Sequence, residues 1–419
     1  LVFQAIEQTA QWQSWYINWH IAKYGKAPEP GAFIGIPDNL QELFQPAYDQ
    51  GARIHSDSWG GGDPGVYDQQ CLDLDHFVWM HKDFLVVVAA GNDGVDISPP
   101  GSGIDAMSVT SPAVAKNCLT VGATENARPE FTTQQFGVWW PKDFPHAPFK
   151  TDPMSDSADD IVPFSSRGPC KSVSFGKPGR RKPDVMAPGS FILSTRSSQI
   201  PANHFSWGAF PPAKHDYMFM GGTSMATPLV AGCAAIVRQY LRQVKQIANP
   251  SAALLKATLI HSAHYLNYRY KRPDSTPWAD NEQGWGRVDL QQVLNPLTPT
   301  QVLFVDNNVG LAVGQANDYL LTLTDPTVPL RITLVYTDFP SPKLVNDLNV
   351  MAYEPNGGRF YLGNDFSDAG IPDAINNVEG IRIANPKMGQ WRIQVVAADV
   401  PRGPQDYALV ISGGGISFG

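Results

Sequence analysis

Several features typical of membrane and nucleic-acid-binding proteins are missing from this chain of 419 residues. Its longest apolar run, residues 84–90, is far shorter than the roughly 18 residues that a membrane-spanning helix needs. Positive charge is also scarce, because 31 Lys and Arg stand against 39 Asp and Glu and the net charge is -8. This balance argues against nucleic-acid binding as the main function, and we expect no membrane or nucleic-acid partner.

Cysteine is rare as well, and its spacing excludes the common metal sites. Cys71, Cys118, Cys170 and Cys233 lie far apart and form no pair with metal-ligand spacing. We expect small buried apolar side chains, with one disulfide left open as an alternative. No Asn-X-Ser/Thr acceptor occurs without Pro in the middle, so glycosylation indicates nothing about the compartment.

The chain also lacks an initiating Met and a leader peptide. It opens on Leu1-Val2-Phe3-Gln4-Ala5, which has the composition of a core strand. We therefore expect the natural protein to extend upstream of residue 1.

What is present up to about residue 295 is an alternation of helix and strand patterns. This rhythm predicts an α/β fold, a parallel sheet with helices on both faces, in a first domain over 1–297. The expected helices are 39–51, 67–83, 224–243 and 251–265, and the expected strands are 52–56, 84–90 and 118–123.

The pattern changes at Asn295-Pro296-Leu297-Thr298-Pro299-Thr300, which is typical of a linker. Short β-type runs separated by Gly, Pro, Asn and Asp follow it. They predict an all-β sandwich or jelly-roll domain over 298–419. The runs are 301–305, 319–324, 330–337, 348–353, 391–398 and 407–412.

The strongest chemical signal is Gly221-Gly222-Thr223-Ser224-Met225-Ala226-Thr227-Pro228. Two glycines allow a tight turn, and a helix beginning at Ser224 would direct free N–H groups and its positive dipole end at the space beside the hydroxyl. A developing oxyanion would be stabilised there. We expect Pro228 to lie so early in the helix that its missing N–H costs nothing. The alternative is that Ser224 is only an N-cap.

A second segment, Val86-Val87-Val88-Ala89-Ala90-Gly91-Asn92, places Asn92 at the end of a buried strand. The carboxyl ends of such strands are where α/β sheets place their sites, and an amide is a neutral donor suited to an oxyanion. The alternative is an ordinary turn Asn.

Together with Ser58-Trp59-Gly60, these segments resemble the subtilase family of serine proteases over nearly the whole chain. The resemblance is closest to the alkaline, oxidatively stable subtilases that carry a C-terminal jelly-roll domain. It implies that residues 1–297 form a subtilisin-like domain, truncated at its N-terminus. It also implies that Ser224 is the nucleophile and that Asn92 holds the oxyanion. It also implies secretion, protein or peptide substrates, and a specificity pocket lined by Ser58, Trp59, Gly60, Ala89, Ala90 and Gly91.

Two family motifs are absent: the Asp-Thr/Ser-Gly motif with the triad Asp, and the His-Gly-Thr-His motif with the triad His. In the family both precede a strand like that at 1–5, so we expect an upstream segment to supply them. The local histidines are expected to be packing or surface residues: His20 in the Trp-rich stretch 11–20, His55, His76, His81, His261 and His264.

Acidic and amide side chains gather in loops of the predicted β-domain. Asp338, Asn346, Asp347, Asn364 and Asp365 carry the oxygen ligands that Ca²⁺ prefers. Related enzymes with this domain bind calcium, so the resemblance implies a structural calcium site; ordinary turn chemistry is the alternative.

Three functions follow from these residues. The first is a serine endopeptidase that needs the upstream Asp and His, and the second is an inert subtilase scaffold that acts in binding or structure. The third, an esterase using His261 or His264, is disfavoured because Ala226 stands where the Gly-x-Ser-x-Gly motif needs its second Gly.

Overall fold

The structure, a computed structural model, describes most of the chain from residue 36 onward. The described residues are 36–97, 101, 103–173, 176, 178–198, 200, 204, 206–209, 216–270 and 278–419, with residues 2, 4, 8–9, 14, 17–18, 21–22 and 31–32 before them. His20, and most of both the strand predicted at 1–5 and the Trp-rich stretch, lie outside these residues.

Residues Leu1–Arg53 form one compact unit and Ile54–Gly419 another. In the first unit, strands β1 (Gln8–Thr9) and β2 (Gly31–Ala32) pair antiparallel, and helix α2 (Gln41–Asp49) occupies most of the helix predicted at 39–51. The buried side chains Leu43, Phe44 and Ala47 lie on one stripe of α2, as its apolar spacing predicts.

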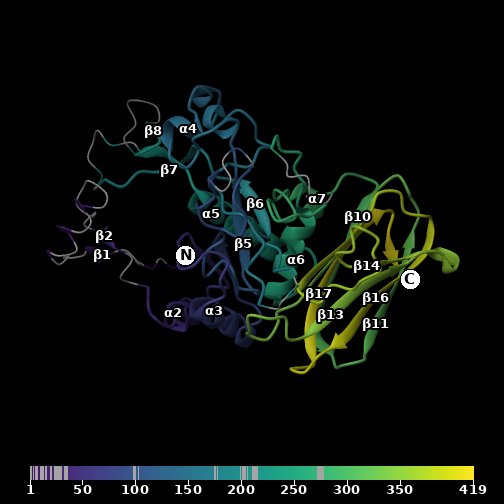
Figure 1. The fold of residues 1–419 in the computed structure, drawn as a ribbon. Helices are drawn as coiled ribbons and strands as arrows, with labels where there is room; N and C mark the ends of the chain where they lie inside the picture. Colours follow the sequence, from purple (N-terminus) through teal and green to yellow (C-terminus); the bar gives the residue numbers. More distant parts are fainter. Residues whose placement is uncertain are drawn as a thin grey trace. The chain divides into compact units, whose positions relative to one another are not determined.

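A parallel sheet lies at the centre of the second unit (Figure 1). Its strand order is β3 (Ile54–Asp57), β4 (Leu85–Ala89), β5 (Leu119–Thr124) and β6 (Val185–Pro188). Every residue of β4 is buried, so both faces of the sheet are covered. Helix α5 (Thr223–Gln243) packs against all four strands, and α3 (Gln69–Met80) against β4.

Helix α6 (Ala252–Ser262) is buried at all eleven positions. It contacts α5 and β4 on one side and the strands β12 and β17 on the other, and Figure 1 shows it between the two sets of strands. A helix that is buried on every side, with its polar side chains hydrogen-bonded, belongs in such an interior position. Ser251 begins it as predicted, since its side chain accepts a hydrogen bond from the Leu254 N–H at 3.0 Å.

From Thr300 onward the chain forms two packed antiparallel sheets. One has the order β10-β17-β12-β15 and the other β14-β13-β16-β11-β18, around a core that includes Trp391, Tyr336 and Tyr407. This confirms the α/β fold with a C-terminal all-β region; the 297/298 boundary and the jelly-roll connectivity stay predictions. The strands are β10 (Thr300–Leu311), β11 (Ala316–Leu323), β12 (Leu330–Val335), β13 (Asp347–Tyr353), β14 (Phe360–Leu362), β15 (Val378–Ile383), β16 (Gly389–Asp399), β17 (Gln405–Gly414) and β18 (Ser417–Phe418).

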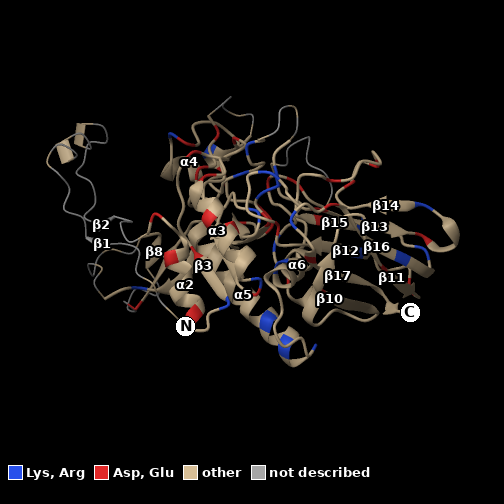
Figure 2. Ribbon diagram, turned by 90° about the horizontal axis from the view of Figure 1, so that it is seen from below, with Lys and Arg blue, Asp and Glu red and all other residues tan. Residues whose placement is uncertain are grey.

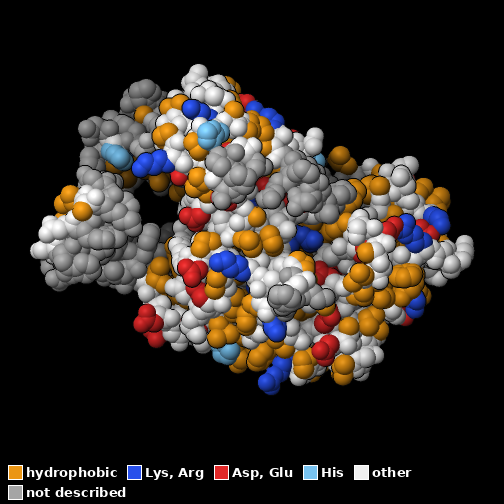
Figure 3. Space-filling model, in the orientation of Figure 1, with side chains coloured by type: hydrophobic (Ala, Val, Ile, Leu, Met, Phe, Trp, Pro, Cys, Tyr) orange, Lys and Arg blue, Asp and Glu red, His pale blue; other side chains and the backbone are white. Residues whose placement is uncertain are grey.

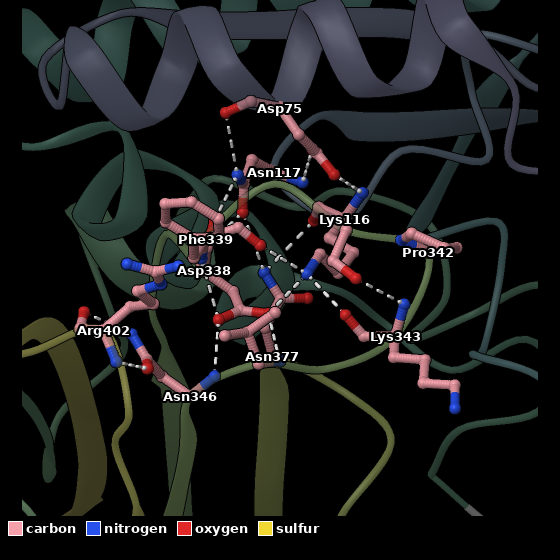
Figure 4. A network of polar contacts seen from close by, with 12 residues as sticks. Asp75, Lys116, Asn117, Asp338, Phe339, Pro342, Lys343, Asn346, Asn377 and Arg402 are labelled. Atoms are coloured by element: carbon pink, nitrogen blue, oxygen red, sulfur yellow. Dashed lines mark hydrogen bonds and ion pairs between the residues drawn. The ribbon is translucent and has the colours of Figure 1, made fainter.

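A buried ion pair joins the parallel-sheet region to the β-sandwich (Figure 4). Lys116 Nζ lies 2.5 Å from Asp338 Oδ2, and both side chains are fully buried. The ammonium also donates to the carbonyl oxygens of Phe339 and Lys343, each at 2.8 Å. Three acceptors satisfy its three donors, which is the condition for a buried charge to be tolerated.

The smaller elements surround this frame. A three-stranded antiparallel sheet, in the order β7-β9-β8, precedes α5. The elements are α4 (Phe136–Trp139), α7 (Gln291–Leu294), β7 (Ile192–Thr195), β8 (Gly208–Ala209), β9 (Tyr217–Met220) and the 3₁₀ turns Pro129–Phe131, Phe149–Thr151 and Pro355–Gly357.

All four cysteines are free thiols, three of them buried and Cys233 half-buried, so the disulfide alternative is wrong. In the part of the chain that the structure describes, no helix has the length and apolarity to cross a membrane. Figure 2 shows basic and acidic residues mixed along the ribbon, and Figure 3 shows hydrophobic side chains scattered among polar ones on the visible face.

Candidate active site

Ser224 is the second residue of α5, directly after a turn made by two glycines. Gly222 is the N-cap and has a φ of 138°, a conformation that favours glycine. The Ser224 side chain is half-buried and donates a hydrogen bond to the Ser58 carbonyl oxygen at 3.0 Å. The N-cap alternative for Ser224 is therefore wrong, because its hydroxyl does not cap the helix.

Two hydrogen bonds join Ser58 and Ser224, one in each direction. Pro228 explains why the Ser224 carbonyl is free to accept one of them. Pro228 is the sixth residue of α5, beyond the first turn, so our expectation that its missing N–H costs nothing is wrong. It leaves the Ser224 carbonyl without its donor from position i+4. The Ser58 hydroxyl donates to that carbonyl at 2.8 Å. The proline thus frees the acceptor that fixes the segment around Ser58 beside the nucleophile.

Asn92 lies three residues beyond β4 and is held by Thr223. Its Oδ1 accepts the Thr223 backbone N–H at 2.9 Å and the Thr223 hydroxyl at 3.1 Å. Because both donors engage the oxygen, the amide group Nδ2 is left to face away from Thr223. The neighbouring Asp93 is partly desolvated, and this raises the pKa of its carboxyl.

The residues predicted to line the specificity pocket form two strips, residues 58–60 and residues 89–91, and one further segment joins them. Gly61 exchanges backbone hydrogen bonds with Ser111 at 2.8 and 3.0 Å, and the Thr110 N–H donates to the Ala90 carbonyl at 3.3 Å. Glycine is required next to these bonds, because a Cβ at Gly60 would lie 2.8 Å from the Ser111 oxygen. Sequence reasoning missed residues 110 and 111, which carry no motif.

The positions of the strip residues follow from their strands. Trp59 and Ala90 are buried, while Ser58 and Gly60 remain exposed. At Gly91, where φ is 108°, a Cβ would lie 2.7 Å from Ser166 Oγ, so only glycine fits. The role of these residues in substrate binding stays a prediction.

An aromatic cluster supports the turn before the nucleophile. The Trp207 ring lies against Gly221, so closely that a Cβ there would overlap it. Ring centroids of four aromatic residues lie 5.1 to 6.1 Å from that of Trp207: Trp139, Trp140, Phe164 and Phe191. The sequence offered only the glycine pair as a signal for this contact.

No imidazole or carboxylate among the described residues donates to or accepts from Ser224 Oγ by a hydrogen bond. His261 has both ring nitrogens engaged, by Thr333 at 3.0 Å and Ser412 at 2.8 Å. This excludes His261 as the base of an esterase. His55 pairs with Asp57 at 3.0 Å on β3, and the His81 ring stacks on Phe77.

The predicted calcium ligands do not fit a cation at Asp338. An ammonium already lies on its Oδ2, and its oxygens accept the N–H groups of Phe339, Val345 and Asn346. Asp365 accepts the N–H groups of Ala369 and Gly370, as turn residues do. Among the residues described, no three His, Cys, Asp or Glu side chains group so as to hold a metal.

Comparison with known proteins identifies the family. The sequence profile of the subtilase family (Peptidase_S8) matches residues 18–286, well over half of the chain. The chain belongs to the subtilase family. The match spans β3 to β6, the segment with Asn92 and the whole of α5.

Curated relatives are much longer than this chain. The serine protease/ABC transporter B family protein tagD of Dictyostelium discoideum is 27% identical over 505 residues, which cover 94% of this chain and 27% of that protein. The serine protease AprX of Bacillus subtilis (strain 168) is 32% identical over 183 residues, or 43% of this chain and 32% of that protein. The chain thus spans about a quarter of the length of the tagD-type relatives.

Among solved structures, the prenylagaramide maturation protease PagA is similar, with 21% sequence identity and a TM-score of 0.37. The match covers 60% of this chain and 64% of that one.

Proposed function

We propose that this chain is the greater part of a serine endopeptidase that hydrolyses peptide bonds through an acyl-enzyme on Ser224. The observation that carries the proposal is the meeting of Ser224 and Asn92 at the start of α5, in a chain of the subtilase family. An amide donor and a helix N-terminus beside one hydroxyl suit a reaction that develops negative charge on oxygen.

The mechanism assigns a step to each group. Ser224 Oγ attacks the scissile carbonyl carbon, and a base takes its proton. Asn92 Nδ2 and the Ser224 backbone N–H donate to the oxyanion of the tetrahedral intermediate, since the first-turn N–H groups have no intrahelical acceptor. The base then protonates the leaving amine, and water releases the acyl group by the reverse sequence.

The base and its orienting carboxylate are proposed to come from the segment upstream of residue 1. Two surfaces of the described chain support this. Leu229 and Ile236, seven residues apart on α5, are 41% and 51% exposed, so the helix presents two large apolar side chains on one of its faces. In addition, β3 has one pairing partner in the sheet, β4, and leaves its other edge open among the residues described.

The test is labelling of the native protein with a fluorophosphonate probe, with the modified peptide mapped by mass spectrometry. We expect modification at Ser224, and its loss together with all peptidase activity in Ser224→Ala. Ser367→Ala, an exposed serine of the β-sandwich, is the matched control and should change neither. Peptidase activity that survives Ser224→Ala would refute the assignment.

The second candidate is an inert scaffold on which the same fold serves binding or structure. The observation in its favour is that the Ser224 hydroxyl is bonded to a backbone carbonyl instead of a base. Folded native protein that resists the probe would establish it. Secretion, protein substrates bound along the two strips, and a calcium site away from Asp338 stay predictions of the endopeptidase proposal.

A further inference from the structure

A cavity of about 820 Å³ opens between the parallel-sheet region and the β-sandwich. Its lining includes Gly168, Arg180 and Arg181 on one side and Lys343, Ile371 and Asp373 on the other. None of its lining residues belongs to the nucleophile segment or to the two strips beside it. Its volume is within the range of about 300 to 1,000 Å³ that is usual for ligand sites.

The acidic residues of this cavity have their oxygens in use. Asp373 accepts four hydrogen bonds, from the N–H groups of Ile375 and Asn376 and the side-chain amides of Asn364 and Asn376. Asp280 accepts three, from the N–H groups of residues 282 and 283 and the Tyr265 hydroxyl. Glu282 pairs with Arg167 at 2.8 Å. These carboxylates are therefore occupied by local donors.

The basic residues, by contrast, retain free donors. Arg181 is half-buried, and its guanidinium carbon lies 5.5 Å from the centroid of the Trp285 ring and 5.8 Å from that of Phe366. In the described part of the chain its guanidinium has neither a hydrogen-bond acceptor nor a carboxylate at ion-pair distance. A guanidinium packed beside two aromatic rings presents a rigid fork that matches a carboxylate.

Arg180 adds a second incompletely paired guanidinium. It is only 7% exposed, and its Nη1 and Nη2 donate to the carbonyls of Pro342 and Val114 at 2.7 and 2.8 Å. Its Nε has no partner among the described residues. Burial also lowers the pKa of Arg181. An anion in the cavity would supply the half-buried Arg181 guanidinium with an acceptor.

The rim of the cavity is apolar and basic. Val173 and Ile371 are 48% and 68% exposed, and both line it. The backbone carbonyl of Lys343 accepts a hydrogen bond from Lys116 Nζ. Figure 4 shows the Lys343 side chain directed away from the polar network around Lys116 and Asp338. A ligand complementary to this cavity therefore carries carboxylates that pair with its basic residues and apolar groups that cover Val173 and Ile371.

We propose that this cavity binds an acidic peptide segment in which carboxylate and apolar side chains alternate. One carboxylate lies on the Arg181 guanidinium beside its two aromatic rings, a second approaches Lys343, and apolar side chains cover Val173 and Ile371. The site is separate from the proposed catalytic residues, so its occupation does not depend on Ser224 or on the upstream base.

The test is fluorescence anisotropy with the full chain carrying Ser224→Ala, so that no probe is cleaved. The probes are two fluorescein-labelled peptides, Glu-Leu-Glu-Ile-Glu and Gln-Leu-Gln-Ile-Gln. We expect the acidic peptide to bind at least about tenfold more tightly, and the difference to shrink as the salt concentration rises from about 0.05 M to about 0.5 M. Arg181→Met should weaken the acidic peptide about tenfold, as expected for a lost charge-assisted hydrogen bond.

Arg392→Met is the control, because Arg392 is not among the residues that line the cavity. It lies on β16, where its Nη1 is 3.8 Å from Asp318 Oδ2. If Arg181→Met unfolds the chain, Lys343→Gln at an exposed position carries the test, with weaker binding at an unchanged melting temperature. Equal affinity for the two peptides, or an equal loss in Arg392→Met, would overturn the proposal. The labelled acidic peptide is also displaced with unlabelled acidic peptide and with inorganic phosphate. If phosphate displaces it at the same concentration as the unlabelled peptide, the cavity is a simple anion site instead.

Discussion

The orientation of a single amide, that of Asn92, depends on one neighbour. Thr223 donates twice to Oδ1, and the same hydroxyl lies 3.2 Å from the Gly91 carbonyl. A side chain held by two donors loses little further freedom when an oxyanion forms, and this preorganisation is the source of its effect on the transition state.

We predict that Asn92→Leu lowers kcat by about 10² to 10³ and changes KM little, the magnitude being that known for such a donor in subtilisin, a member of this family. Hydrolysis of a peptide substrate by the native protein measures both constants. Asn308→Leu, at an exposed position of β10, is the control and should leave them unchanged. A rise in KM alone would show that Asn92 binds the ground state instead.

The first turn of α5 is positioned by its neighbours as much as by its own hydrogen bonds. The Trp207 ring packs against Gly221, and the Ser58 hydroxyl donates a hydrogen bond to the Ser224 carbonyl. The helix interior is less constrained, because a Cβ at Gly232 would meet nothing within 4 Å.

We predict that Gly221→Ala destabilises the fold by about 1 to 3 kcal/mol, since the new methyl overlaps the Trp207 ring. It should also slow fluorophosphonate labelling of Ser224. Adding Trp207→Ala should recover part of the labelling rate, because it removes the atoms in conflict. Thermal unfolding and labelling kinetics are the measurements.

The control on the same helix is Gly232→Ala, which we expect to stabilise the protein by about 0.5 to 1 kcal/mol, the usual advantage of Ala over Gly in a helix. A double variant that labels no faster than Gly221→Ala alone would show that Trp207 does not set the position of the turn.

At the scale of the whole molecule, α6 joins the two regions of the second unit. His261 donates or accepts at both ring nitrogens with Thr333 and Ser412 of the β-sandwich, while Lys256 on the same helix donates to the Lys116 and Cys118 carbonyls. Because every side chain of α6 is buried, the parallel-sheet region depends on the sandwich to cover its apolar surface.

This arrangement predicts a pH dependence of stability. Burial lowers the pKa of His261 well below its usual range, and the nearby Arg331 and Arg382 lower it further. As the pH falls below about 6.5, the unfolded chain takes up a proton that the folded protein cannot bind. We therefore expect the free energy of unfolding to fall on acidification, by up to about 1.4 kcal/mol per pH unit for this group.

Denaturant unfolding between about pH 7 and pH 5 measures this slope. His261→Gln should be less stable at pH 7 but should lose less stability on acidification. His76→Gln, at an exposed position of α3, should keep the slope of the parent protein. An unchanged slope in His261→Gln would contradict the prediction.

The sequence by itself determined the order of the elements and the residues most suited to chemistry. Apolar spacing located α3, α5 and α6, and short β-type runs located most of the sandwich strands, because these patterns depend on neighbours within a few residues. The glycine pair before Ser224 and the strand before Asn92 were visible for the same reason. Seven strands of the second unit were not predicted, since their patterns are short or weak: β6, β7, β8, β9, β14, β15 and β18.

Only the tertiary structure decided the contacts between residues that are not close in the sequence. Three contacts carry no local signal in the sequence. The Ser58 hydroxyl donates to the carbonyl that Pro228 leaves free, Trp207 packs in the aromatic cluster, and the Lys116 ammonium pairs with Asp338. Asp338, for example, has a carboxylate of the kind that binds calcium, but it forms an ion pair with the Lys116 ammonium. A residue's type sets what it can bind, whereas packing decides which partner reaches it.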